Sequence, residues 1–164
     1  MIHKIRNIFF AVLTLIALVM VTAAIVNGQK QTTRNAHVAP VQQPLYSEYR
    51  GVRIGMTASE VRAKLGEPMQ KADDGDFYAF SEKETAQVAY DVAHIVKTIS
   101  VDYIGGVGAP DYKAVVGADV DVKPDGAIYK VVRYDALGLW VYYNRTAGDA
   151  PIVTITLQRS LDHQ

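Results

Sequence analysis

The sequence predicts an α+β fold in which a short helix and an antiparallel three-stranded meander occur twice, with the helices packed on one sheet face, after an N-terminal transmembrane or signal helix. Three observations predict this fold. Residues 8–26 form an uncharged hydrophobic run, residues 57–66 carry strong helix start and stop signals, and the segment 58–78 is similar to the segment 109–129. A repeated helix and strand pattern is typical of tandem folds.

The hydrophobic run is the first element, and it predicts a membrane anchor. Lys4 and Arg6 precede the run, which as a helix would reach about 28 Å, close to the roughly 30 Å of a bilayer core. The alternative is a signal peptide that is cleaved near Thr22–Ala24 or Val26–Gly28. In both cases the basic residues keep the N-terminus in the cytoplasm and place the remainder outside it. We therefore expect residues 1–26 to be an anchor or signal peptide.

Residues 27–49 come next and are rich in Gln, Thr, Asn and Pro, without hydrophobic periodicity. This composition predicts a flexible linker between the N-terminal helix and a folded part. The folded part is expected to consist of a first repeat at 50–104 and a second at 105–162.

A short helix opens the first repeat. Thr57 and Glu60 have the spacing of a capping box, in which each side chain bonds the other residue's backbone N–H. Val61 and Leu65 share one face of the helix, and Gly66 supplies a left-handed stop. A helix this short is marginal in water by itself, so we expect its apolar face to pack on a sheet.

The strands are predicted from alternating apolar and polar residues and from Asp-Gly turns. A second, weaker helix is expected over 109–116. The expected strands lie at 77–81, 87–92 and 95–103 in the first repeat and at 128–134, 139–144 and 152–158 in the second.

The residues Gly55–Pro68 (GMTASEVRAKLGEP), followed by Phe77–Phe80, resemble the SmpA/OmlA (BamE-like) family over residues 51–104, with a second copy at 109–158. The resemblance implies an α+β envelope protein that assists the insertion of β-barrels into the outer membrane. The lipid-bearing cysteine of that family is absent. The tandem layout also resembles the β-lactamase-inhibitory proteins, which implies binding of a protein across a sheet.

Charge and composition narrow the function classes. Residues 51–164 hold 12 basic and 16 acidic residues, and a mildly acidic domain argues against nucleic acid as a partner. The chain has no cysteine, which excludes disulfides, thiol catalysis and cysteine-based zinc sites. We expect no catalytic residues, metal or cofactor. The alternative is a small hydrolase or small-molecule-binding domain centred near His94, which is the histidine within the folded part.

Aromatic residues gather in the second repeat. Strand alternation places Trp140 and Tyr142 on one face and Tyr143 on the other. Trp and Tyr are favoured anchors of protein interfaces, so Trp140, Tyr142, Tyr129 and Arg133 are the candidate partner-binding residues. The alternative is that these aromatics pack under the helices or as cross-strand pairs.

Together these observations predict a non-enzymatic protein-binding module of the cell envelope. Residues 8–26 would hold it in the inner membrane, with the C-terminal domain in the periplasm, and cleavage would make it periplasmic or secreted. The expected partner is another envelope protein.

Overall fold

A computed structural model describes residues 41–160 of the chain. The predicted anchor or signal peptide and residues 27–40 of the predicted linker lie outside the described residues. No helix within residues 41–160 has the length and hydropathy of a membrane span.

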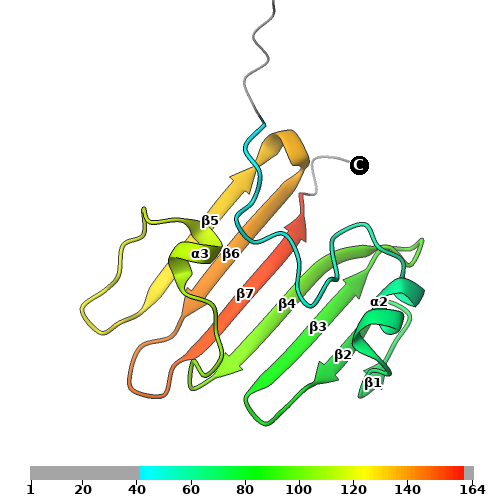
Figure 1. Cartoon of the computed structure of the whole chain (residues 1–164), viewed down its shortest axis with the longest axis horizontal. Coiled ribbons are helices and arrows are strands. Elements are labelled where there is room, and N and C mark those ends of the chain that lie inside the picture. Colours follow the sequence, from blue (N-terminus) through cyan, green and yellow to red (C-terminus); the bar gives the residue numbers. More distant parts are fainter. Residues whose placement is uncertain (1–40, 161–164) are drawn as a thin grey trace, which may run out of the picture. The chain divides into compact units, whose positions relative to one another are not determined.

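One antiparallel sheet of seven strands organises the described residues (Figure 1). Its order is β1-β2-β3-β4-β7-β6-β5, so the fourth strand and the last strand meet in the middle of the sheet. The strands are β1 (Gln70–Lys71), β2 (Gly75–Ala79), β3 (Glu84–Tyr90), β4 (Val96–Ile104), β5 (Ile128–Tyr134), β6 (Leu139–Arg145) and β7 (Ile152–Arg159).

The predicted tandem repeat of helix and three-stranded meander is wrong. β4 pairs with β7 from Thr98↔Gln158 to Ile104↔Ile152, which makes a single sheet across the expected boundary at 104/105. The physical reason is that β4 and β7 would otherwise each expose an unpaired edge, and pairing them satisfies their backbone groups.

The helical part also differs from the prediction. Within residues 41–160, α2 (Ala58–Leu65) is the one helix of seven or more residues. α3 (Tyr112–Val116) is shorter than the expected 109–116, because the Asp111 side chain accepts from the Lys113 N–H and starts the helix there.

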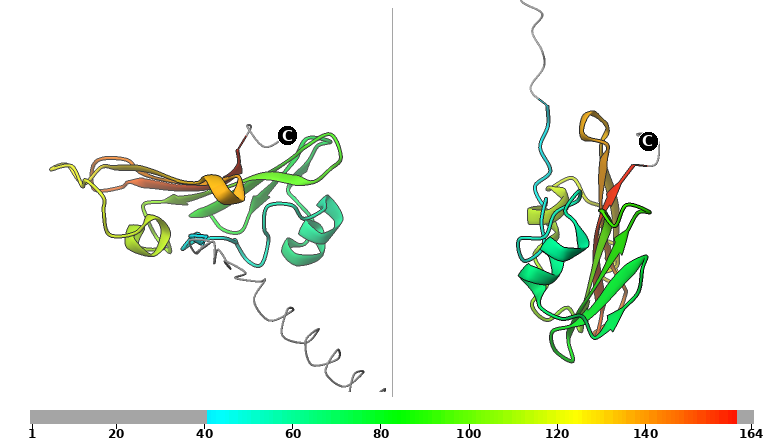
Figure 2. Two further views of the ribbon diagram at one scale, coloured as in Figure 1. Left: turned by 90° about the horizontal axis from the view of Figure 1, so that it is seen from above. Right: turned by 90° about the vertical axis from the view of Figure 1, so that its right-hand side faces the viewer.

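One face of the sheet is covered, and the core lies under the cover (Figure 2). α2, α3 and the segment 45–57 lie on this covered face, and a 3-10 turn, η1 (Asp135–Leu137), joins β5 to β6. Tyr46 and Tyr49, which fall in the predicted linker, pack against the core, and the Tyr49 hydroxyl donates to Glu84 Oε1 at 2.8 Å. The sheet strands contribute the largest buried side chains, among them Tyr90, Ile99, Ile155, Leu157, Val88, Val101 and Val141.

The capping box predicted for α2 is present. The Glu60 N–H donates to Thr57 Oγ1, and the Thr57 N–H donates to Glu60 Oε2 at 2.8 Å, which lowers the pKa of the Glu60 carboxyl. Gly66 ends the helix with φ 84° and ψ −165°, so it has the positive φ that favours glycine but not the predicted left-handed helical conformation.

A buried ion pair ties α2 to β2. Asp76 is 1% exposed, and Arg62 donates to its two oxygens at 2.8 and 2.9 Å. The Tyr90 hydroxyl donates to Asp76 Oδ2 at 2.8 Å. Burial, Asp76 and its hydrogen bond raise the pKa of Tyr78 to about 12, so this neighbour of the carboxylate stays neutral. The buried carboxylate is therefore fully partnered.

We predict that Asp76→Ala lowers the free energy of unfolding by about 3 kcal/mol or more, because it leaves the Arg62 charge without its partner inside the fold. The matched control is Asp74→Ala, two residues away with an exposed side chain, which should change stability by less than about 0.5 kcal/mol. Urea unfolding of the two variants measures the difference, and equal losses would contradict this account of how α2 is held.

Candidate protein-binding face

The second face of the sheet carries no helix within residues 41–160 and is called the open face here (Figure 2). Alternation along each strand directs buried residues such as Val101 and Tyr143 to the covered face and their neighbours to the open face. The open face is formed by Phe77, Ala79, Thr85, Gln87, Ala89, Thr98, Ser100, Asp102, Ile104, Ile152, Thr154, Thr156, Gln158, Trp140, Tyr142, Asn144, Tyr129, Val131 and Arg133.

All four candidate partner-binding residues lie together on the open face, on β5 and β6. Arg133 pairs with Trp140 across the two strands, and its guanidinium carbon lies 5.8 Å from the centre of the Trp140 ring. The rings of Tyr129 and Tyr142 meet edge to face with centroids 5.3 Å apart. We call Tyr129, Trp140 and Tyr142 the aromatic cluster. Strand alternation predicts that Trp140 and Tyr142 share a face, as they do in the structure. A role of the cluster in binding stays a prediction.

A shallow hollow of about 320 Å³ lies within the aromatic cluster. Tyr129 is 66% exposed at its rim, while Trp140 and Tyr142 are half-buried. Burial raises the pKa of the Tyr142 hydroxyl, and the neighbouring Tyr129 adds to this shift. The hollow therefore offers apolar ring surface together with the Tyr142 hydroxyl, which this shift keeps neutral. Its lining consists of Tyr129, Val131, Trp140, Tyr142, Thr156 and Gln158.

A band of polar side chains crosses the middle of the open face where β4 meets β7. Ser100 Oγ and Thr156 Oγ1 lie 3.0 Å apart in a hydrogen bond, and the Thr154 hydroxyl donates to Asp102 Oδ1 at 2.6 Å. Sequence reasoning missed this band as a unit, because it depends on pairing between strands that the repeat hypothesis kept apart. The open face thus has an aromatic side and a polar centre that includes the Asp102 carboxylate.

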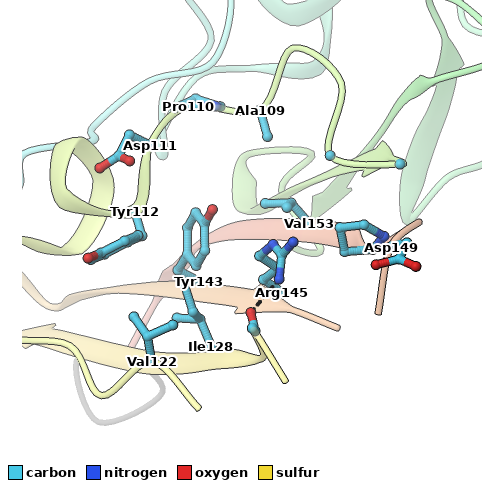
Figure 3. Close-up of a pocket in the computed structure, with 14 residues that line it drawn as sticks. Ala109, Pro110, Asp111, Tyr112, Val122, Ile128, Tyr143, Arg145, Asp149 and Val153 are labelled. Carbon is cyan, nitrogen blue, oxygen red and sulfur yellow. Dashed lines mark hydrogen bonds between the residues drawn. The ribbon is translucent and has the colours of Figure 1, made fainter. Parts of the chain in front are cut away.

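The covered face holds a different hollow, of about 440 Å³, between α3 and the strands β5 to β7 (Figure 3). Tyr143 and Arg145 extend into it from β6, and Arg145 donates to the backbone carbonyl of Gly126. Burial raises the pKa of Tyr143, Asp111 adds to the shift, and Arg145 opposes it. Asp111 and Asp149 lie at the rim, so the hollow holds two acidic side chains and one basic side chain. Within residues 41–160 no group of His, Cys, Asp and Glu is placed to hold a metal ion.

His94 lies outside both hollows. Its side chain is exposed on the turn between β3 and β4, where its φ is 56°. Its backbone has a structural role, because its carbonyl accepts from the Ala58 N–H at 3.0 Å and its N–H donates to the Asp91 carbonyl at 2.9 Å. The structure thus places His94 at the start of α2 rather than in either hollow.

No family model, curated protein or solved structure matches this chain. The resemblance to the SmpA/OmlA family therefore rests on Gly55–Pro68 and Phe77–Phe80, whereas the resemblance to the β-lactamase-inhibitory proteins rested on the tandem layout that the single sheet contradicts.

We predict opposite consequences for two adjacent tyrosines. Tyr143→Ala should lower the free energy of unfolding by about 3 kcal/mol, because Tyr143 is 4% exposed and packs edge to face with Tyr112 of α3. Tyr142→Ala should cost about 1 kcal/mol, because its ring lies half-exposed on the open face. Chemical unfolding of both variants tests the assignment of the two faces, and a larger loss for Tyr142→Ala would reverse it.

Proposed function

We propose that this chain is a membrane-tethered, extracytoplasmic module of the cell envelope that binds another protein on the open face. The observation that carries the proposal is the aromatic cluster with Arg133 on a sheet face that no described helix covers. Residues 8–26, preceded by Lys4 and Arg6, supply the tether and set the topology.

The composition of the open face supports protein binding. Tyr, Trp and Arg contribute most often to the centres of protein interfaces, since they bury large rings and keep a polar group for a hydrogen bond. Trp140 and Tyr142 line a hollow and Arg133 lies beside Trp140, so a partner side chain could insert among them. The band of hydroxyl groups and the Asp102 carboxylate beside them would form a polar rim.

The extent of the open face also suits a protein partner. Strand spacing of about 4.8 Å and a rise of about 3.3 Å per residue give a seven-stranded face of roughly 600–700 Å². A standard interface takes about 800 Å² from each partner. The face is therefore close in size to one side of a stable interface.

We predict that a photocrosslinking amino acid at Tyr142 of the full chain captures one discrete envelope protein in intact cells. Trp140→Ala in the same chain should reduce this adduct about 30-fold, since a central aromatic anchor contributes roughly 2 kcal/mol or more. Mass spectrometry identifies the adduct.

The matched control places the same photocrosslinker at Val92, which is fully exposed at the β3–β4 turn. This position should give no such adduct. Equal capture from Val92, or capture from Tyr142 that Trp140→Ala leaves unchanged, would count against the open face as the binding surface.

We also predict that the mature chain keeps residues 8–26. It should migrate more slowly on a denaturing gel than a shortened chain that lacks residues 1–28, and it should sediment with membranes while the shortened chain does not. Comigration of the two would instead indicate a cleaved signal peptide. Because the chain has no cysteine, Val92→Cys adds a single thiol that an impermeant maleimide should label in intact cells if the module is extracytoplasmic.

A further inference from the structure

Two polar groups in the hollow of the covered face have hydrogen-bonding capacity that no described residue uses (Figure 3). Tyr143 is 4% exposed, and its hydroxyl forms no hydrogen bond within residues 41–160. Every fully enclosed side-chain nitrogen or oxygen of these residues has a hydrogen-bond partner. The Tyr143 hydroxyl is therefore not enclosed, and it opens into the hollow that its residue lines. A polar group at this depth without a protein partner is uncommon.

Arg145 is the second group. One of its N–H groups donates to the backbone carbonyl of Gly126, which holds the guanidinium near the start of β5. Its other N–H groups have no partner in the described part of the chain, and no described carboxylate forms an ion pair with it. Because a guanidinium carries five N–H donors, most of its capacity remains. Arg145 and Tyr143 are two residues apart on β6, so both side chains project from the same face of the strand.

The two groups together suit a carboxylate. Burial raises the pKa of the Tyr143 hydroxyl, Asp111 adds to the shift and Arg145 opposes it, so the hydroxyl keeps its proton at neutral pH. Both groups therefore donate hydrogen bonds, and a carboxylate accepts from both. The fork of a guanidinium matches the two oxygens of a carboxylate, and such charge-assisted hydrogen bonds are strong.

The rim of the hollow restricts the ligand further. Asp111 and Asp149 line it with exposed side chains, and one oxygen of Asp111 already accepts from the Lys113 N–H. Two carboxylates beside one guanidinium would repel a ligand that carries negative charge alone, and Arg145 would repel a simple cation. A ligand that carries one charge of each sign complements both parts of the hollow.

We propose that the hollow binds the zwitterion of an amino acid or of a short peptide. Its carboxylate accepts from Arg145 and Tyr143 on β6, and its ammonium group faces Asp111 and Asp149 at the rim. The volume of about 440 Å³ lies in the range of small-molecule sites, roughly 300–1,000 Å³. Apolar side chains complete the wall and suit short aliphatic side chains of the ligand; they belong to Val122, Ile128, Pro151 and Val153.

This inference goes beyond the proposed function and does not rest on it. The hollow lies on the covered face, whereas the proposed protein partner binds the open face. Residues of β6 serve the two surfaces in alternation, with Tyr143 and Arg145 on one side and Trp140 and Tyr142 on the other. A failure of either proposal therefore leaves the other in place.

Calorimetric titration of the full chain in detergent tests the ligand class with three zwitterions, L-alanine, L-alanyl-L-alanine and tri-L-alanine. At least one should bind with a Kd of about 1 mM or below, and the tightest of the three distinguishes an amino acid from a peptide as the ligand. N-acetylation of that ligand removes its ammonium group and amidation removes its carboxylate, and each change should weaken binding about tenfold or more. No binding of any zwitterion, or equal binding of the blocked forms, would overturn the proposal.

Tyr143→Phe tests the site without removing its packing. The substitution deletes the hydroxyl that has no partner within residues 41–160 and keeps the ring against Tyr112, so the free energy of unfolding should stay the same or rise. The affinity for the tightest zwitterion should fall about fivefold. Tyr142→Phe is the matched control, since it removes a tyrosine hydroxyl from the open face and should bind as the natural chain does. Equal affinities of the two variants would contradict the site.

Asp149→Asn tests the placement of the ammonium group. Asp149 is exposed and forms no hydrogen bond or ion pair within the described residues, so the change should leave the fold unaffected. It should weaken binding of the zwitterion but not of its N-acetylated form, which narrows the gap between their affinities about threefold or more. A gap as wide as in the natural chain would overturn the proposal.

Discussion

The pairing of β4 with β7 is the constraint on which the rest of the described structure depends. It joins the last strand of the first half of the folded part to the last strand of the second half through seven residue pairs, among them Ile99↔Leu157 and Val101↔Ile155. These four side chains are at most 1% exposed, so the pairing also forms the centre of the core. Without it, a four-stranded sheet and a three-stranded sheet would each have an unpaired inner edge.

Because the described residues form a single sheet, its two faces differ: one is covered by helices and the other is not. The covered face is closed by two small helices and the segment 45–57, and each is held differently: α2 by the Arg62–Asp76 ion pair, the 45–57 segment by Tyr49 and Glu84, and α3 by Tyr112 against Tyr143. Because these covers lie on the same side, the opposite face keeps its polar and aromatic side chains exposed. The open face is thus a consequence of topology as much as of its own residues.

Local signals in the sequence predicted local structure well. The capping box of Thr57 and Glu60 and the separation of Trp140 and Tyr142 from Tyr143 depend on residues within one turn or one strand, and both are found. The sheet as a whole could not be predicted in this way, because β4 and β7 are brought together only by tertiary packing. The same holds for Arg62 and Asp76, since no sequence pattern relates a residue of a helix to one on a later strand. The similarity between segments 58–78 and 109–129 indicated that each begins with a helix followed by a strand. It did not indicate that the last strands of the two halves, β4 and β7, would pair into one sheet.

The aromatic side of the open face is made by a hairpin and not by a single strand. Tyr129 and Arg133 of β5 pair across the hairpin with residues of β6, and Arg133 lies directly opposite Trp140. The intervening residues of the same two strands point the other way, so Tyr143 is 4% exposed and packs against Tyr112 of α3. Changes at Trp140 should therefore act on the open face alone, whereas changes at Tyr143 act on the core.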